Sequence, residues 1–254
     1  MARFIVGQGP LLVLLHGVGL DHTMWQPLAE RLASSRTVLA YDLRGHGEAE
    51  PLEDPASLSQ FTEQLWNEVA DLTTEPFSLC GFSMGAMIAQ RAALEQPQKI
   101  ANLILMSGVH RRTQAQRAGV RERLRQARQD GPASNIDAAI ARWFTPEFCE
   151  QQPDVPERVR YRLRNNNPQE FLKAYAMFTE ADADLAQTAQ SIESRTLVTT
   201  GELDSGSTPD MMIALARELP NAKAHLLKGL AHMAPVEAPD AVAQVMLEFL
   251  GSGS

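Results

Sequence analysis

A serine placed to act as a nucleophile stands at position 83. It is the centre of Gly81-Phe82-Ser83-Met84-Gly85, which follows an apolar run ending at Cys80 and precedes a segment of helical periodicity. A serine on so sharp a strand-to-helix turn is lifted clear of the sheet, and small neighbours let the chain turn there. The N-terminus of the next helix favours developing negative charge. The pattern predicts that Ser83 attacks a carbonyl group.

A serine hydroxyl needs a base near neutral pH. Of the six histidines, His232 lies in the glycine-containing loop between the last predicted strand and the last predicted helix. Loops at the carboxyl ends of parallel strands are where open α/β sheets collect active-site residues. His225 falls inside the strand pattern, so we expect a structural role for it. We predict that His232 is the base.

The base in turn needs a carboxylate that orients its ring. The apolar run Thr196–Thr200 predicts a strand, and Asp204 comes four residues after its end. Glu202 is the competing acid, but it lies nearer the strand and is expected to point away. Asp204 is therefore the predicted acid, and the order serine, aspartate, histidine is the one this arrangement requires.

The negative oxygen of a tetrahedral intermediate needs two N–H donors. One should be the main-chain N–H of Met84, directly after the nucleophile. The other is expected from His16-Gly17-Val18-Gly19, the loop that follows the apolar run Leu11–Leu15, and we assign it to the N–H of Val18. The ring of His16 should then brace this loop and transfer no proton.

The elements that must position these residues are short apolar runs alternating with helical segments, the pattern of a parallel sheet covered on both faces. With one N-terminal strand at Arg3–Val6, the sequence predicts an α/β fold with a mostly parallel, twisted sheet of about seven strands. The other predicted strands are Leu11–Leu15, Thr37–Tyr41, Phe77–Cys80, Leu103–Met106, Thr196–Thr200 and Lys223–Leu227. Helices are expected at Met24–Ala33, Leu58–Leu72, Met84–Glu95, Met211–Glu218 and Asp240–Phe249.

The rhythm breaks between Gly108 and Ile192, where no strand pattern occurs and prolines interrupt amphipathic stretches. We predict a helical cap at 109–191, inserted before the strand that carries the acid, in a core of 1–108 and 192–250. Residues 251–254 look like a tail or linker scar. From His110 to Glu170 there are twelve Arg against eight Asp and Glu, a local charge of about +4 in a chain of net charge −8. Such an asymmetry can mark the entry of an anionic ligand.

Composition excludes several classes of function. The net charge of −8 argues against a nucleic-acid or anionic-membrane surface. No basic segment precedes a long apolar run near the N-terminus, and no apolar run is long enough to span a bilayer. The two cysteines, Cys80 and Cys149, form neither a disulfide framework nor a metal-ligand spacing. We expect a cytoplasmic protein that needs no cofactor and no metal.

Together these motifs resemble the α/β-hydrolase superfamily over nearly the whole chain. Asp42-Leu43-Arg44-Gly45-His46-Gly47 adds to the likeness. Within the superfamily, Met24-Trp25, Trp143-Phe144-Thr145-Pro146-Glu147-Phe148 and Thr200-Gly201-Glu202-Leu203-Asp204 resemble the branch of 3-oxoadipate enol-lactonases and small carboxylesterases. Dehalogenases and epoxide hydrolases of this fold use an aspartate where this chain has Ser83.

The resemblance implies a substrate pocket between the cap and the core. A lactonase of a dicarboxylic substrate should offer cations to its carboxylates, although exposed arginines are more often simply solvated. Trp143 and Trp25 are expected to line the pocket. The candidate cations by position are Arg44, Arg111, Arg112 and Arg142.

The sequence thus predicts a serine hydrolase that cleaves a small carboxylic ester or lactone, which could be anionic, through an acyl-enzyme. Two alternatives remain open. The same triad serves carbon–carbon bond hydrolases, thioesterases and acyltransferases, and some proteins of this fold keep a triad and act as ligand receptors with little turnover. Neither the oligomeric state nor the identity of the ester or lactone follows from the sequence.

Overall fold

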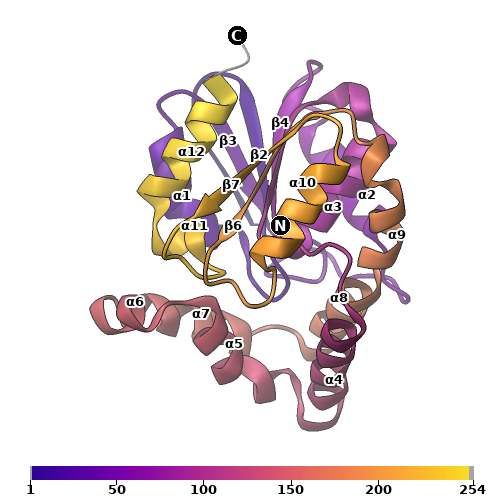
Figure 1. Cartoon of the computed structure of the whole chain (residues 1–254), viewed down its shortest axis with the longest axis vertical. Coiled ribbons are helices and arrows are strands. Elements are labelled where there is room, and N and C mark those ends of the chain that lie inside the picture. The colour runs from indigo at the N-terminus through magenta and orange to yellow at the C-terminus, as the bar shows by residue number, and fades with distance from the viewer. Residues whose placement is uncertain (1, 252–254) are drawn as a thin grey trace.

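A seven-stranded sheet forms the centre of the protein, whose structure, a computed structural model, describes residues 2–251 (Figure 1). The strand order is β1-β3-β2-β4-β5-β6-β7. Strand β1 pairs antiparallel with β3, and all other neighbours are parallel. The strands are β1 (Arg3–Gly7), β2 (Leu11–Leu15), β3 (Thr37–Tyr41), β4 (Phe77–Phe82), β5 (Ile100–Met106), β6 (Arg195–Gly201) and β7 (Ala222–Leu227).

The apolar runs of the inner strands are buried because both faces of the sheet are covered there, whereas the edge strands β1 and β7 are largely exposed. In β2, Val13 and Leu15 pack into a core cluster on one face, whereas Leu12 and Leu14 pack into a cluster on the other. This follows from the two-residue period of a strand. The prediction of a mostly parallel sheet of about seven strands, with a single N-terminal strand, is confirmed.

Helices cover the two faces in separate groups (Figure 1). One face carries α1 (Gln26–Leu32), α11 (Ala234–Glu237) and α12 (Pro239–Gly251), with the 3-10 turn η1 (His22–Trp25) beside α1. The other carries α2 (Leu58–Val69), α3 (Met84–Glu95) and α10 (Pro209–Glu218). A short turn, η2 (Pro97–Lys99), leads into β5. Gly251, predicted to lie in the tail, is the last residue of α12; residues 252–254 lie outside the described residues.

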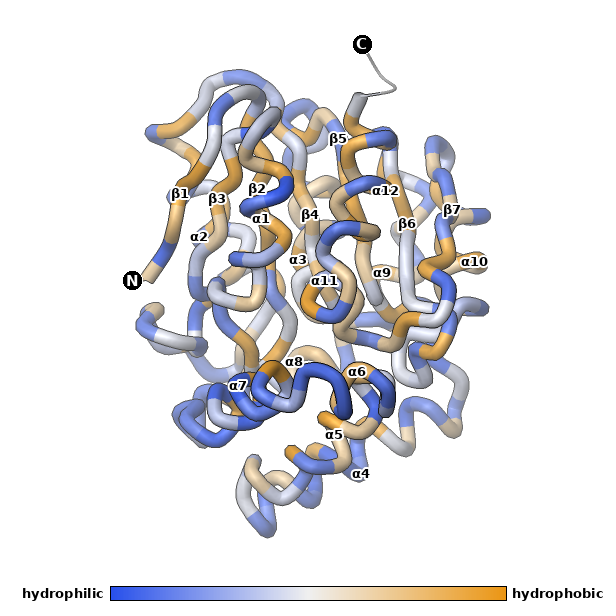
Figure 2. Tube along the Cα trace, turned by 90° about the vertical axis from the view of Figure 1, so that its left-hand side faces the viewer, coloured by the Kyte–Doolittle hydropathy of each residue, from blue (hydrophilic) through white to orange (hydrophobic). Residues whose placement is uncertain are grey.

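The segment between β5 and β6 is helical, and most of it lies across one end of the sheet (Figure 1). Figure 2 shows many hydrophilic residues along these helices, with hydrophobic residues among them. The covering helices end at Glu180, because α9 (Asp182–Thr188) and η4 (Ala189–Ser191) already run beside the sheet, where α9 packs against α3. The covering elements are α4 (Gln114–Asp130), η3 (Pro132–Asn135), α5 (Ile136–Trp143), α6 (Pro146–Gln151), α7 (Asp154–Arg164) and α8 (Pro168–Glu180). We call α4 to α8 the cap.

Side-chain caps fix where the cap helices begin. Thr113 and Gln116 form a reciprocal capping box at the start of α4. Thr145 accepts from the N–H of Phe148 in α6, and Asn167 accepts from two N–H groups at the start of α8. Each supplies an acceptor for donors that a helix leaves unpaired. Within residues 2–251, no helix is both long enough and apolar enough to cross a membrane.

Candidate active site

Ser83 occupies a strained turn between β4 and α3. Its backbone has φ 54° and ψ −112°, a region that residues with a side chain rarely adopt. Its N–H donates to the carbonyl of Met106 at 2.9 Å. A Cβ atom on Gly81 would lie 2.1 Å from the carbonyl oxygen of Gly85, and one on Gly85 would lie 2.3 Å from that of Leu15. The two glycines are therefore required by close backbone approach.

Asp204 and His232 meet beside this turn. The imidazole Nδ1 of His232 lies 2.6 Å from Oδ2 of Asp204, and both side chains are buried. The other carboxylate oxygen, Oδ1, accepts from the N–H groups of Gly206 and Ser207, each at 2.9 Å. The hydroxyl of Thr200 lies 3.2 Å from Oδ2 and 2.8 Å from the carbonyl oxygen of Ser207, so its single proton has two acceptors within reach. Two main-chain donors of the loop after β6 thus fix the carboxylate.

The electrostatics keep this carboxylate ionised. Burial alone raises the pKa of Asp204, but the charge of His232, its hydrogen bond and the N–H groups of Ser207 and Gly206 outweigh burial and lower the pKa below its usual value. An ionised Asp204 holds the proton of His232 on Nδ1, which leaves Nε2 free to accept one. Glu202, the competing acid, is exposed and accepts from the N–H of Gly229 at 2.9 Å.

The loop expected to form the oxyanion hole packs directly on the nucleophile. Gly17 to Leu20 form a turn closed by a hydrogen bond from the N–H of Leu20 to the carbonyl of Gly17, at 3.2 Å. A Cβ atom on Gly17 would lie 3.2 Å from the Cβ of Ser83. Val18, the next residue, lines the same cavity as Ser83. Met84, the other expected donor, is buried as the first residue of α3.

His16 braces this loop, as predicted. Its Nδ1 lies 2.8 Å from the carbonyl of Gly17, and its Nε2 accepts from the N–H of Leu43 at 2.9 Å. The ring is fully buried, so it links the loop after β2 to the loop after β3 and is closed to solvent. Because one nitrogen donates and the other accepts, these two bonds require the neutral ring.

A cavity of about 410 Å³ lies between this site and the cap. Ser83, Asp204 and His232 line its floor, and Trp143 and Tyr175 line its cap side. The Trp143 ring lies 5.8 Å from the His232 ring, centroid to centroid, so the cap contacts the predicted base directly. A smaller, mainly apolar cavity of about 60 Å³ adjoins it under α4 and α5 and also contacts Trp143 and Tyr175.

Three arginines face this cavity, and they differ in their partners. Arg112 is buried and paired with Asp182 at 2.8 Å, so its charge is used inside the protein. The Nε of Arg123 donates to the hydroxyl of Tyr175 at 3.2 Å. Arg142 is half buried, and burial together with the nearby charge of Arg123 lowers its pKa. Among residues 2–251, no carboxylate forms an ion pair with Arg123 or Arg142.

Arg123 was not among the residues singled out from the sequence. Helix α4 carries arginines at 117, 121, 123, 125 and 128, and nothing in one dimension tells which of them faces the core. Arg111, one of the four candidates, does not line the cavity. Its Nε forms an ion pair with Oε1 of Glu218 at 2.5 Å. Arg142 and Arg112 do line the cavity, as does Trp143.

Two expected pocket residues lie elsewhere, and this corrects the sequence-based assignment. Trp25 is fully buried in the core on the α1 side, where its ring packs edge-on against Phe82 at 6.2 Å. The turn η1 therefore places this ring in the core and away from the cavity. Arg44 pairs with Glu50 at 3.4 Å, and its N–H donates to Gln64 at 2.9 Å. It stabilises the loop after β3 and does not line the cavity.

One cluster of the described residues has a composition suited to a metal ion. The ligand atoms of Asp21, His22 and Asp42 all lie within 4.8 Å of one another. They are already engaged, because Nδ1 of His22 lies 2.5 Å from Oδ1 of Asp42 and Asp21 forms an ion pair with Arg162 at 3.2 Å. We interpret the cluster as part of a polar network that links the loop after β2, the loop after β3 and helix α7.

Comparisons with known proteins agree with this geometry. Residues 12–245 match the family described as "Alpha/beta hydrolase family". The chain is 31% identical to the (E)-2-((N-methylformamido)methylene)succinate hydrolase of Acinetobacter baylyi, over 97% of this chain and 92% of that protein. It is 26% identical to 3-oxoadipate enol-lactonase 2 of the same organism, over 94% of this chain and 88% of that protein.

Solved structures of hydrolases are also similar to this chain. The enol-lactonase of Burkholderia xenovorans superimposes with a TM-score of 0.90 at 27% identity, covering 98% of this chain and 96% of that one. A malate-bound thermophilic esterase of Thermogutta terrifontis gives 0.90 at 27% identity, covering 99% and 93%. The resemblance to enol-lactonases inferred from the motifs is confirmed. The chain therefore belongs to the alpha/beta hydrolase family.

Proposed function

We propose that the protein hydrolyses a small carboxylic ester or lactone that also carries a free carboxylate. Ser83 and His232 line the cavity, and so do Arg123 and Arg142, for which residues 2–251 supply no carboxylate in an ion pair. An arginine binds a carboxylate through parallel N–H donors, which fixes orientation as well as charge. A nucleophile in one cavity with two cations that no carboxylate of residues 2–251 neutralises is the observation that carries the proposal.

In the reaction we propose, the Oγ of Ser83 attacks the carbonyl carbon while Nε2 of His232 takes its proton. The N–H groups of Val18 and Met84 stabilise the oxyanion. The carbon–oxygen bond to the leaving alcohol then breaks, and His232 returns the proton to that oxygen. A water molecule that His232 deprotonates attacks the acyl-enzyme, and the acid leaves as Ser83 regains its proton. No step requires a metal or a cofactor.

The relatives support an anionic substrate. Two of them are named for 3-oxoadipate enol-lactone, one for a substituted succinate, and one solved esterase holds malate. The name of the relative at 31% identity also contains a formamide group. Cleavage of an N-formyl amide that carries carboxylates, by the same triad, is therefore the second candidate.

The test is hydrolysis of a panel of short esters, five- and six-membered lactones and N-formyl amides, each with and without a carboxylate. We expect the carboxylate-bearing ester or lactone to be turned over best, and Ser83→Ala to lower the rate by about 10⁴–10⁶-fold. Ser34→Ala is the matched control, because Ser34 is exposed after α1. Turnover that survives in Ser83→Ala would contradict the assignment of the nucleophile.

Two further outcomes separate the remaining alternatives. A single stoichiometric burst without further turnover would favour a receptor. Esters or thioesters formed with added alcohol or thiol would favour an acyltransferase. Rapid repeated release of free acid supports the hydrolase.

A further inference from the structure

The turn that carries Val18 is held from both sides. On the core side Gly17 packs on Ser83, as described above. On the cap side lies Gly19, which has φ +78° and on which a Cβ atom would lie 2.8 Å from Cδ2 of Leu163 in α7. The cap therefore rests directly on the turn, with no space between them even for a methyl group.

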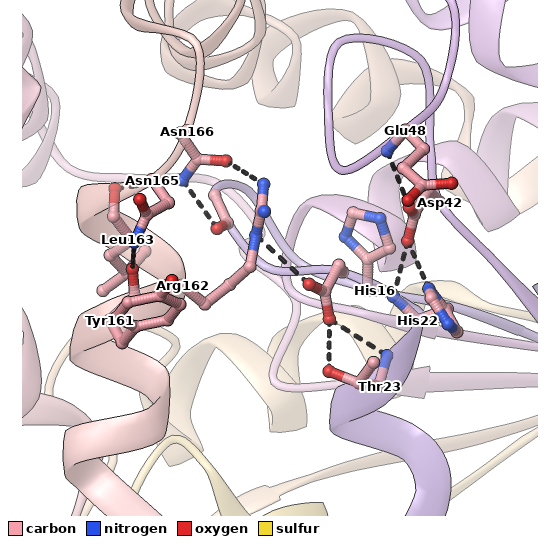
Figure 3. A network of polar contacts seen from close by, with 12 residues as sticks. His16, His22, Thr23, Asp42, Glu48, Tyr161, Arg162, Leu163, Asn165 and Asn166 are labelled. Carbon is pink, nitrogen blue, oxygen red and sulfur yellow. Dashed lines mark hydrogen bonds and ion pairs between the residues drawn. The ribbon is translucent and has the colours of Figure 1, made fainter. Parts of the chain in front are cut away.

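Asn166, just after the end of α7, makes a polar contact to the same turn. Its side chain is buried, 8% exposed, and its Nδ2 donates to the carbonyl of Gly19 at 2.8 Å (Figure 3). Its Oδ1 accepts from Nη2 of Arg162 at 2.5 Å. Because a guanidinium only donates, this contact fixes which end of the amide is the oxygen and directs the NH₂ group toward Gly19.

Arg162 makes a second contact to the loop. Its Nε lies 3.2 Å from Oδ2 of Asp21 (Figure 3). Oδ1 of Asp21 in turn accepts from the N–H of Thr23 at 3.0 Å and caps η1. Arg162 and Asn166 thus hold the segment Gly19–Asp21 at both of its ends.

We propose that Asn166, oriented by Arg162, is a positioning residue for the oxyanion hole. It fixes the carbonyl of Gly19 so that the Gly17–Leu20 turn keeps the N–H of Val18 aimed at the reacting carbonyl. Neither side chain lines the cavity that holds Ser83, so both act through the turn and not on the substrate. The proposal rests on the proposed function, because it needs Val18 to serve as an oxyanion donor.

The consequence for turnover follows from what an oxyanion donor does. Deleting one such donor costs about 10²–10³ in turnover. A donor that is displaced but still present should cause a smaller loss of turnover, about 10-fold to 100-fold. Since the interaction forms only in the transition state, kcat and kcat/KM should fall together while KM stays unchanged.

The experiment compares four variants with the wild type on the best ester of the panel. Asn166→Asp keeps the shape and the contact to Arg162 but turns a carboxylate oxygen toward the Gly19 carbonyl. Asn166→Leu removes the donor without adding charge. Arg162→Lys keeps a cation near Asp21 but loses the planar fork that also reaches Asn166. The control is Asn165→Asp, an exposed neighbour whose Nδ2 donates to the carbonyl of Tyr161 within the end of α7.

Two readouts are taken: kcat and KM, and the affinity for phenylboronic acid, which forms a tetrahedral adduct with an active serine. We expect kcat to fall about 10–100-fold in both Asn166 variants and less in Arg162→Lys, with phenylboronic acid affinity falling by the same factor. Asn165→Asp should match the wild type. If the Asn166 variants do not fold, Arg162→Lys tests the proposal through the same two readouts, kcat and the affinity for phenylboronic acid.

Wild-type kcat and phenylboronic acid affinity in folded Asn166 variants would overturn the proposal. So would a loss of kcat without loss of affinity, or an equal loss in Asn165→Asp. These failures leave Ser83-dependent turnover in the wild type intact, and so leave the proposed function standing. A wild type whose turnover does not depend on Ser83 would overturn both.

Discussion

The two carboxylate oxygens of Asp204 have different partners: one contacts His232, and the other accepts hydrogen bonds from the loop that carries Asp204. Oδ2 lies 2.6 Å from Nδ1 of His232, while Oδ1 accepts from the N–H groups of Gly206 and Ser207. With Oδ1 tied to two main-chain donors, the carboxylate cannot rotate without breaking both bonds. The orientation of the imidazole is therefore set by the backbone of the loop after β6.

Asp204→Asn should abolish most of the activity while leaving the fold intact. The amide cannot hold the Nδ1 proton as an ionised carboxylate does, so the imidazole adopts the wrong tautomer, and kcat should fall by about 10⁴-fold. Steady-state kinetics on the best ester measures this, and a thermal melt checks the fold. Glu202→Gln, which changes an exposed carboxylate of the same loop, is the control. A loss of less than tenfold in Asp204→Asn would argue against this triad.

Removing the cavity cations should change which substrates are preferred. Arg142→Met and Arg123→Met each keep an apolar stem but lose a charged donor, and a hydrogen bond to a charged group contributes about 1.5–3 kcal/mol. We expect KM for a carboxylate-bearing ester to rise by roughly 10–100-fold and KM for the neutral analogue to stay unchanged. Arg125→Met is the control, since Arg125 is exposed and paired with Glu122. Equal losses on both esters would show that the arginines only support the cap.

Two glycine-to-alanine changes should act in opposite directions on stability. Gly85→Ala places a Cβ 2.3 Å from a backbone oxygen of β2, so the elbow must shift and the melting temperature should fall. In Gly119→Ala the nearest atom is the flexible end of Arg123 at 3.7 Å. Alanine is a better helix former, so α4 should gain about 0.5–1 kcal/mol and the melting temperature roughly 1–4 °C. A lower melting temperature for Gly119→Ala would contradict this.

Residues tied to strand ends could be predicted from the sequence, whereas residues tied to the cap could not. Ser83 and Asp204 follow the buried strands β4 and β6, and His232 follows the edge strand β7; parallel strands bring such positions to one edge of the sheet. Trp25 lies in the turn η1 after β2, yet its ring points into the core, an orientation that periodicity does not specify. The roles of Arg123 and Asn166 depend on how cap helices pack on the core, and this is decided by contacts between residues far apart in the chain.

Two buried histidines should make stability depend on pH. The rings of His16 and His46 meet edge-on at 5.1 Å, and burial lowers the pKa of His16 to about 4 and that of His46 to about 3, from an ordinary value of 6.5. Below pH 6.5 these two histidines therefore bind protons in the unfolded chain but stay neutral in the folded protein. Stability is then fully present above pH 6.5 and is lost as pH falls toward 4 and 3, by up to about 1.4 kcal/mol per pH unit for each ring.

Urea unfolding at pH 7 and at pH 5 measures this loss. His46→Gln keeps a donor for the carbonyl of Arg44, which Nδ1 of His46 now contacts at 3.0 Å, but it cannot take up a proton. Its free energy of unfolding should fall less between the two pH values than that of the wild type, by about 1–2 kcal/mol. His225→Gln changes an exposed ring on β7 and should keep the wild-type difference. If His46→Gln loses as much free energy of unfolding between pH 7 and pH 5 as the wild type, protonation of His46 does not cause the loss. The pH dependence must then come from other groups.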